Sequence, residues 1–228
     1  MSEANVKPAF IFKTAGKTPG QYDKDGGLLL VEIHSPIRIG PEDCYYRFQR
    51  YQEDQFDFVS ALPPTIHDQL VVRFSSVSAR LNWQEALRWK DRSPSTRLEW
   101  GQEKIGRMIA RSRLVVHSYD STGILETLSL NIPTLCFWQN DLDHLKDDAK
   151  PFYRMLQEAE ILANSAGSAA DFIAKHWDTI ELWWHSEKVQ GARRLFCQHF
   201  ARTEVAPAAT LKGLLTAPLP SRTIKNRA

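Results

Sequence analysis

The most constraining feature of this chain is a strand, turn, helix and strand pattern within residues 113–138. Residues 114–116 and 134–138 are mostly apolar and rich in β-branched or aromatic side chains, as buried strands are. Between them, four apolar residues recur at helical spacing, namely Ile124, Leu125, Leu128 and Leu130. Asn131 can take the left-handed conformation that ends a helix, and Pro133 prevents the helix from continuing. A unit in this order is typical of proteins with a parallel sheet.

The polar turn of this unit, residues 117–123, places backbone N–H groups and hydroxyls at the start of the helix. The helix dipole there favours an anion such as phosphate. Glu126 lies one turn inside the helix, close enough to the same ligand to accept hydrogen bonds from sugar hydroxyls. The alternative is structural, because Asp120, Ser121 and Thr122 are also the residue types that cap helices. An anion site and simple capping both stay open on this pattern.

Strand and helix patterns alternate through the first part of the chain. Strands are predicted at residues 28–33, 70–74 and 97–100, and helices at 45–62, 83–89 and 103–111. This alternation predicts an α/β fold with a Rossmann-like parallel sheet and right-handed crossovers. Helical patterns at 147–162 and 168–202 add a helical C-terminal extension. We expect a loose lead-in over residues 1–26, one domain over 27–203, and a disordered tail over 204–228, which has little apolar content.

The unit at residues 113–138 resembles the donor-site signature of two-domain, GT-B type glycosyltransferases. In those enzymes a Ser/Thr turn is followed by a pattern close to E-A-x-A-x-G-x-P, and here residues 120–122 precede ETLSLNIP. Thr127 and Ser129 stand at the two small positions, and Asn131 stands where glycine is usual. That departure is mild, because Asn also adopts the left-handed conformation.

A closer resemblance is to the C-terminal part of a bacterial family of transferases, named from spirochaete genomes and associated with surface-carbohydrate loci. It is carried by VVRFSS, LRWKD, SRLVVHSYDSTGILETLSLNIPTLCFW, PFYRMLQEAEIL and WWHSEKVQGARRLFCQHFART. The likeness is strong over residues 70–203 and weak before Gly26. It implies the donor-binding, C-terminal half of a GT-B fold with a nucleotide-activated sugar as donor, and it supplies no particular substrate.

Further candidate residues lie on the same predicted edge of the sheet. Arg73 ends a strand where ligands of open parallel sheets bind, and the resemblance implies that it faces the donor phosphates. A surface ion pair is the alternative for Arg73. Trp83 and Arg88 follow on the next loop and helix, where they are placed to close over a nucleotide. His34 ends the first strand and is the candidate acid or base, although such a histidine is more often a hydrogen-bonded filler. The expected donor-binding residues are Arg73, Trp83, Arg88, Asp120, Ser121, Thr122 and Glu126.

Composition and motifs argue against several other classes. The formal net charge of +2 is too small to indicate a nucleic-acid partner, and no run approaches the roughly 20 apolar residues that span a bilayer. The N-terminus lacks the basic start and apolar core of a secretory signal. Three widely separated cysteines fit a reducing cytoplasm, with the inner face of the membrane as an alternative location. GxGxxG, GxxxxGKS/T and GxSxG are missing, which argues against dinucleotide, P-loop and esterase chemistry.

We also expect no cofactor and no metal. The acidic cluster that could bind a cation consists of Asp141, Asp143, His144, Asp147 and Asp148. A solvated loop followed by the first turn of a helix explains it more simply, because acidic residues are stabilised near helix N-termini.

The resemblance predicts a transferase in which an acceptor hydroxyl attacks the anomeric carbon of a nucleotide sugar. Its general base normally lies in an N-terminal domain, for which about 26 residues before the first strand are too few. We therefore expect a fragment, or one part of a split enzyme that works with a separate acceptor-binding domain or subunit. Two alternatives stay open: a non-catalytic nucleotide-binding module, and a structural Rossmann-like domain without ligand.

Overall fold

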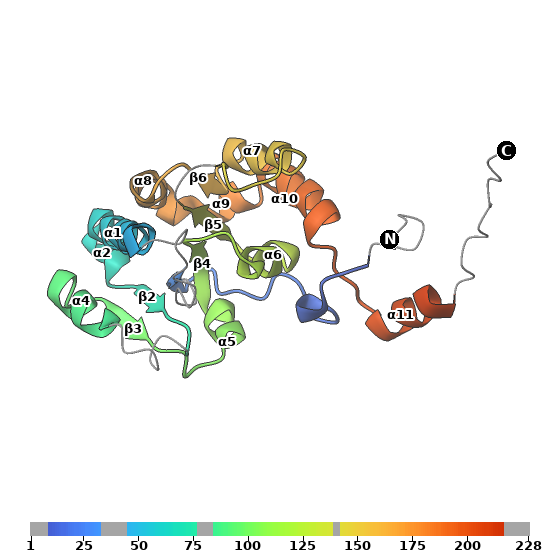
Figure 1. Ribbon diagram of the computed structural model, residues 1–228, viewed down its shortest axis with the longest axis horizontal. Coiled ribbons are helices and arrows are strands. Elements are labelled where there is room, and N and C mark those ends of the chain that lie inside the picture. The colour runs from blue at the N-terminus through green and yellow to red at the C-terminus, as the bar shows by residue number, and fades with distance from the viewer. Residues whose placement is uncertain (1–8, 33–44, 77–83, 139–141, 217–228) are drawn as a thin grey trace.

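The computed structural model describes residues 9–32, 45–76, 84–138 and 142–216. Within them, six parallel strands form one sheet in the order β3-β2-β1-β4-β5-β6 (Figure 1). The strands are β1 (Gly27–Val31), β2 (Leu70–Arg73), β3 (Arg97–Glu99), β4 (Ser112–His117), β5 (Thr134–Phe137) and β6 (Leu162–Ala163). This topology confirms the predicted α/β fold with a Rossmann-like parallel sheet.

Helices connect and cover these strands. They are α1 (Tyr45–Ala61), α2 (Pro64–His67), α4 (Glu85–Arg92), α5 (Ile105–Ala110), α6 (Thr122–Ser129), α7 (Lys150–Glu158), α8 (Ala166–His176), α9 (Ile180–Trp184), α10 (Glu187–Phe200) and α11 (Pro207–Thr216). Two short 3-10 helices are η2 (Phe12–Thr14) and η3 (Trp177–Thr179). Among the described helices, none combines the length and the apolar character that crossing a membrane requires.

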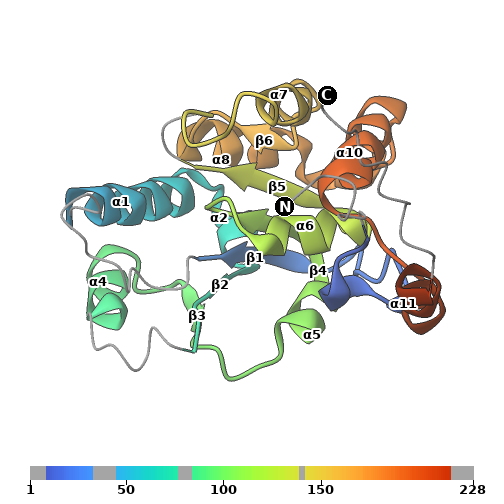
Figure 2. The same cartoon turned by 45° about the vertical axis from the view of Figure 1, so that its right-hand side comes forward.

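Both faces of the sheet are covered, which explains why its strands read as continuous apolar runs. Alternate residues of a strand point to opposite faces. Leu28 and Leu30 of β1 therefore join the larger core, to which α1 and α8 contribute, while Leu29 packs in a smaller cluster with Met108 of α5. Figure 2 shows α1 and α8 on one side of the sheet and α5 on the other.

The predicted unit at residues 113–138 is present as β4, α6 and β5. Asn131 has a φ of 55°, which confirms the left-handed residue expected after the helix. Some details differ from the sequence prediction. The two-residue strand β6 was not expected, and the single helix predicted over 168–202 is divided into four segments. Ser186 begins the last of them by accepting the Val189 N–H, so a new cap interrupts the helical pattern.

The lead-in pairs with the segment at the boundary between the domain and the expected tail. The Ile11 N–H donates to the Arg202 carbonyl at 2.9 Å, and the Gly16 N–H donates to the Glu204 carbonyl at 2.9 Å. Farther along, the Gly20 N–H donates to the Leu130 carbonyl, which joins the lead-in to the end of α6. The tail, expected to be disordered, includes the ten-residue helix α11, which has no buried residue and extends away from the sheet (Figure 1).

Candidate functional site

The strand order reverses between β1 and β4, and ligands of open α/β sheets bind beyond the carboxyl ends of strands at such a point. Ser118 follows β4 there, and its hydroxyl donates to the Val31 carbonyl at 3.2 Å. The Tyr51 hydroxyl lies 2.8 Å from the Ser118 Oγ and is then the donor of that bond. These hydrogen bonds connect α1 to the carboxyl ends of β1 and β4, where the strand order reverses. Neither residue was among the predicted site residues.

Helix α6 begins directly beside this point. Ser121 is its N-cap, with Oγ accepting the Gly123 N–H at 3.1 Å. Thr122 is the first helical residue and is exposed. Capping by Ser121, one of the two roles considered from the sequence, is therefore observed. It leaves the exposed Thr122 at the positive end of the helix dipole.

His117, the last residue of β4, lies buried under the first turn of α6. A Cβ added at Gly123 would come within 2.9 Å of the His117 Cε1, so glycine allows the helix to approach the ring this closely. The His117 Nε2 lies 3.2 Å from the Thr127 Oγ1. Burial lowers the pKa of His117 to about 3, so the ring is neutral at physiological pH. His117 was not among the predicted site residues, although its position directly after the apolar run 114–116 places it at this edge of the sheet.

The Asp120 carboxylate, on a side chain that is 25% exposed, contacts two other side chains. The Tyr153 hydroxyl of α7 donates to its carboxylate at 3.2 Å, and the His144 Nε2 lies 3.1 Å from its Oδ2. Burial and the negative charge of Asp120 raise the pKa of Tyr153. Asp120, a predicted donor-binding residue, thus contacts two side chains that the sequence pattern did not connect with it.

Arg73 is engaged on the other side of the reversal point. Its guanidinium lies 2.8 Å from the Glu99 carboxylate and also donates to the Glu103 carbonyl at 3.1 Å. Burial tends to raise the pKa of Glu99, but backbone N–H groups, including that of Glu103, and the Arg73 charge outweigh it and lower the pKa. Strand β3, which carries Glu99, lies on the side of β2 away from β4. The Arg73–Glu99 ion pair therefore directs the Arg73 side chain away from α6. The ion pair that was the alternative for Arg73 is thus present.

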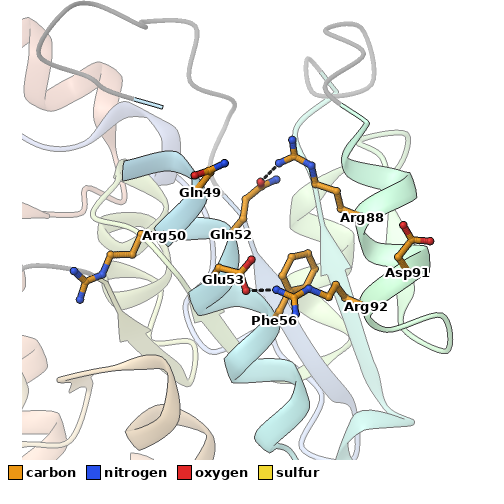
Figure 3. A pocket seen from close by; sticks show the side chains of 8 residues that line it. All are labelled: Gln49, Arg50, Gln52, Glu53, Phe56, Arg88, Asp91 and Arg92. Carbon is orange, nitrogen blue, oxygen red and sulfur yellow. Dashed lines mark hydrogen bonds and ion pairs between the residues drawn. The ribbon is translucent and has the colours of Figure 1, made fainter. Parts of the chain in front are cut away.

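Arg88 lies in a groove between α1 and α4, shown in Figure 3. The groove has a volume of about 700 Å³. Arg88 donates to the Gln52 amide oxygen, and Arg92, one turn later, pairs with Glu53. The Arg92 guanidinium also lies 5.2 Å from the centre of the Phe56 ring. Arg88 therefore faces α1, and the contacts in this groove join α4 to α1.

Glu126 lies beside a different cavity of about 240 Å³, which is bounded by α5, α6 and the lead-in. Its carboxylate lies 2.9 Å from the Lys13 Nζ. The side chain of Glu126 is 23% exposed and that of Lys13 is 67% exposed, so water or a ligand can reach the pair. Glu126 is thus accessible but already has a partner.

The structure therefore distributes the predicted residues over several places. Asp120, Ser121, Thr122 and Glu126 lie on or directly before α6, whereas Arg73 and Arg88 face β3 and α1. His34 and Trp83 lie outside the described residues.

Two buried carboxyls at the same edge of the sheet were not predicted. Glu32 directly follows β1 and is 7% exposed, and Glu85 at the start of α4 is 8% exposed. The Glu32 Oε1 and the Glu85 Oε2 have no hydrogen-bond partner among the described residues. Burial, and then the charge of Glu85, raises the pKa of Glu32 well above its usual value. Within the part of the chain that is described, no group of three or more His, Cys, Asp or Glu is arranged to hold a metal ion.

Comparison with known proteins adds a family and a similar solved structure. A family model described as LIC12162 family transferase matches residues 2–215. A solved structure of the wall teichoic acid polymerase TagF with CDPG has 11% sequence identity and a TM-score of 0.42, and the match covers 88% of this chain and 43% of that polymerase. The chain thus spans less than half the length of this polymerase. No curated protein matches the sequence.

Proposed function

This chain belongs to the LIC12162 family of transferases, and we propose that it binds the nucleotide part of an activated sugar donor. In this proposal the Rossmann-like sheet is the donor-binding half of a GT-B type glycosyltransferase. A separate domain or subunit supplies the acceptor site, and the product is a surface or cell-envelope carbohydrate. Two free, buried cysteines, Cys136 and Cys197, suit a protein that works in a reducing cytoplasm.

One observation carries the proposal. The N-terminus of α6 opens at the carboxyl end of β4, next to the reversal of strand order, with a capping serine and an exposed threonine. Backbone N–H groups and the helix dipole at such a position favour phosphate. In a transfer reaction they stabilise the charge that develops on the departing phosphate as the acceptor hydroxyl attacks.

The test separates phosphate binding from helix stability by placing a charge at Thr122. In Thr122→Asp the new carboxylate repels a bound phosphate, so we expect affinity for a nucleoside diphosphate to fall at least tenfold, about 1.4 kcal/mol. The same carboxylate interacts favourably with the positive end of the helix dipole, so it should stabilise the unliganded protein by about 0.3–1 kcal/mol. Titration calorimetry with UDP, GDP, CMP and CDP measures affinity, and thermal unfolding measures stability.

Gly167→Asp is the matched control. It adds the same charge in the first turn of α8, where an added Cβ meets nothing closer than the Ser165 Oγ at 4.0 Å. We expect it to leave nucleotide affinity unchanged. The proposal fails if a folded wild-type protein releases no heat with any of the four nucleotides. It also fails if both variants weaken binding equally, because the effect is then one of net charge.

A further inference from the structure

The carboxylate of Asp120 holds an imidazole at the edge of the sheet. The His144 Nε2 lies 3.1 Å from the Asp120 Oδ2, and the Tyr153 hydroxyl donates to the same carboxylate, 3.2 Å from Oδ1 and 3.3 Å from Oδ2. The carboxylate is therefore held between two donors. The side chain of His144 is 41% exposed, so one side of its ring faces solvent.

The surroundings fix this arrangement. Tyr153 is buried, and its ring packs edge-on against Trp138, with centroids 6.0 Å apart, and against Phe196, with centroids 5.2 Å apart. Trp138 also meets the His144 ring edge-on, with centroids 5.9 Å apart. A ring held by a hydrogen bond and an aromatic contact loses little further freedom when it reacts, as a catalytic group requires.

The hydrogen bond also determines which nitrogen of His144 can act. A carboxylate accepts hydrogen bonds, so the neutral imidazole that pairs with it carries its proton on Nε2. The lone pair is then on Nδ1, which has no hydrogen-bond partner among the described residues. A carboxylate, an oriented imidazole and a free ring nitrogen together make an acid–base pair.

The location of the pair connects it with the transfer reaction. Asp120 directly precedes Ser121, the N-cap of α6, so the imidazole lies at the edge where the donor phosphate is proposed to bind. We propose that His144 is the catalytic base of this transferase and that Asp120 is its positioning residue, an inference that rests on the proposed function. The resemblance to GT-B enzymes implies a base in another domain, so a base within this chain departs from that expectation.

In the proposed step, Nδ1 of His144 accepts the proton of the attacking hydroxyl. The oxygen of that hydroxyl forms a bond to the anomeric carbon of the donor. The bond between this carbon and the phosphate oxygen breaks, and its electron pair leaves with the phosphate. Asp120 stabilises the imidazolium, which then releases its proton to water.

The test measures hydrolysis of nucleotide sugars by the full chain, with water as the acceptor. The nucleotide sugars are those whose nucleotide binds in calorimetry. We expect His144→Gln to lower donor hydrolysis by roughly 10²–10⁴-fold, the usual contribution of a general base, while donor affinity stays within twofold. Asp120→Asn should lower hydrolysis with the same unchanged affinity. Added imidazole should partly restore hydrolysis to His144→Ala, which a merely structural histidine would not show. His199→Gln, at an exposed histidine of α10, is the matched control and should hydrolyse as the wild type does.

A second measurement tests the Asp120–His144 hydrogen bond without any reaction. Nitrogen-15 NMR of histidine-labelled protein should show the His144 proton on Nε2, and Asp120→Asn should remove that preference. The assignment is overturned if His144→Gln hydrolyses donor at the wild-type rate, if the wild type binds donor without hydrolysing it, or if the proton resides on Nδ1. A wild type that binds no donor rejects the proposed function itself, and this assignment with it.

Discussion

We expect Glu32 to couple the stability of this protein to pH. Its side chain is buried, with the residue 7% exposed, and burial followed by the charge of Glu85 raises its pKa well above the usual value. Burial also raises the pKa of Glu85, although Arg88 opposes that rise. The folded protein thus binds these protons more tightly than the unfolded chain does. The stabilisation is fully present below the unfolded pKa of about 4.3 and is lost as pH rises through the raised folded pKa.

Replacing Glu32 by glutamine should remove this loss. Glutamine keeps the shape but carries no charge, so we expect Glu32→Gln to have a higher Tm than the wild type at pH 7 and a smaller fall in Tm between pH 5 and pH 8. Each kcal/mol recovered corresponds to about 2–4 °C in a domain of this size. Glu158→Gln, at an exposed carboxylate of α7, is the control and should behave as the wild type. A lower Tm for Glu32→Gln at pH 7 would show that the charged form is needed.

Glu126 has two possible uses, and Lys13 allows them to be separated. If Glu126 accepts hydrogen bonds from hydroxyls of the sugar donor, Glu126→Gln should weaken donor binding by roughly 1.5–3 kcal/mol, the usual contribution of a hydrogen bond to a charged group. Lys13→Ala removes the same ion pair but leaves the carboxylate, so affinity should hold or rise. An exposed pair contributes only about 0–1 kcal/mol to folding, so both variants should stay folded. Calorimetry and thermal unfolding on the two proteins decide the question. Unchanged affinity in both, with equal losses of stability, would make Glu126 structural.

Elements could be predicted from the sequence where their pattern is local and long enough. Five strands were recognisable because burial on both faces makes them continuous apolar runs, whereas two residues of β6 carry no such pattern. Asn131 signalled the end of α6 because few residue types tolerate its conformation. The interruption of the last helix at Ser186 was missed, since Trp183, Trp184 and Val189 continue an apolar pattern through it.

Directions of side chains could not be predicted in the same way. The sequence placed Arg73 at the correct edge of the sheet, but its partner Glu99 belongs to a neighbouring strand. Asp120 meets His144 and Tyr153, which are 24 and 33 residues away. Strand order decides which of these residues meet, and a single sequence carries no direct signal for it. The position and cap of α6 were predictable because its residues are contiguous.

At the scale of the whole molecule, the lead-in pairs with residues 202–204, and this pairing determines where the tail can be removed. The Ile11 and Gly16 N–H groups donate to the Arg202 and Glu204 carbonyls, whereas α11 buries no residue. We expect truncation after Ala206 to change Tm by less than about 2 °C, since little surface becomes exposed. Truncation after Ala201 removes both acceptors and should lower Tm further, by about 2–4 °C for each kcal/mol lost. Differential scanning calorimetry of the two truncations against the full chain measures this boundary. A marked loss of stability in the longer truncation would show that α11 docks on the domain, and equal Tm values for all three proteins would show that the pairing of the lead-in contributes nothing.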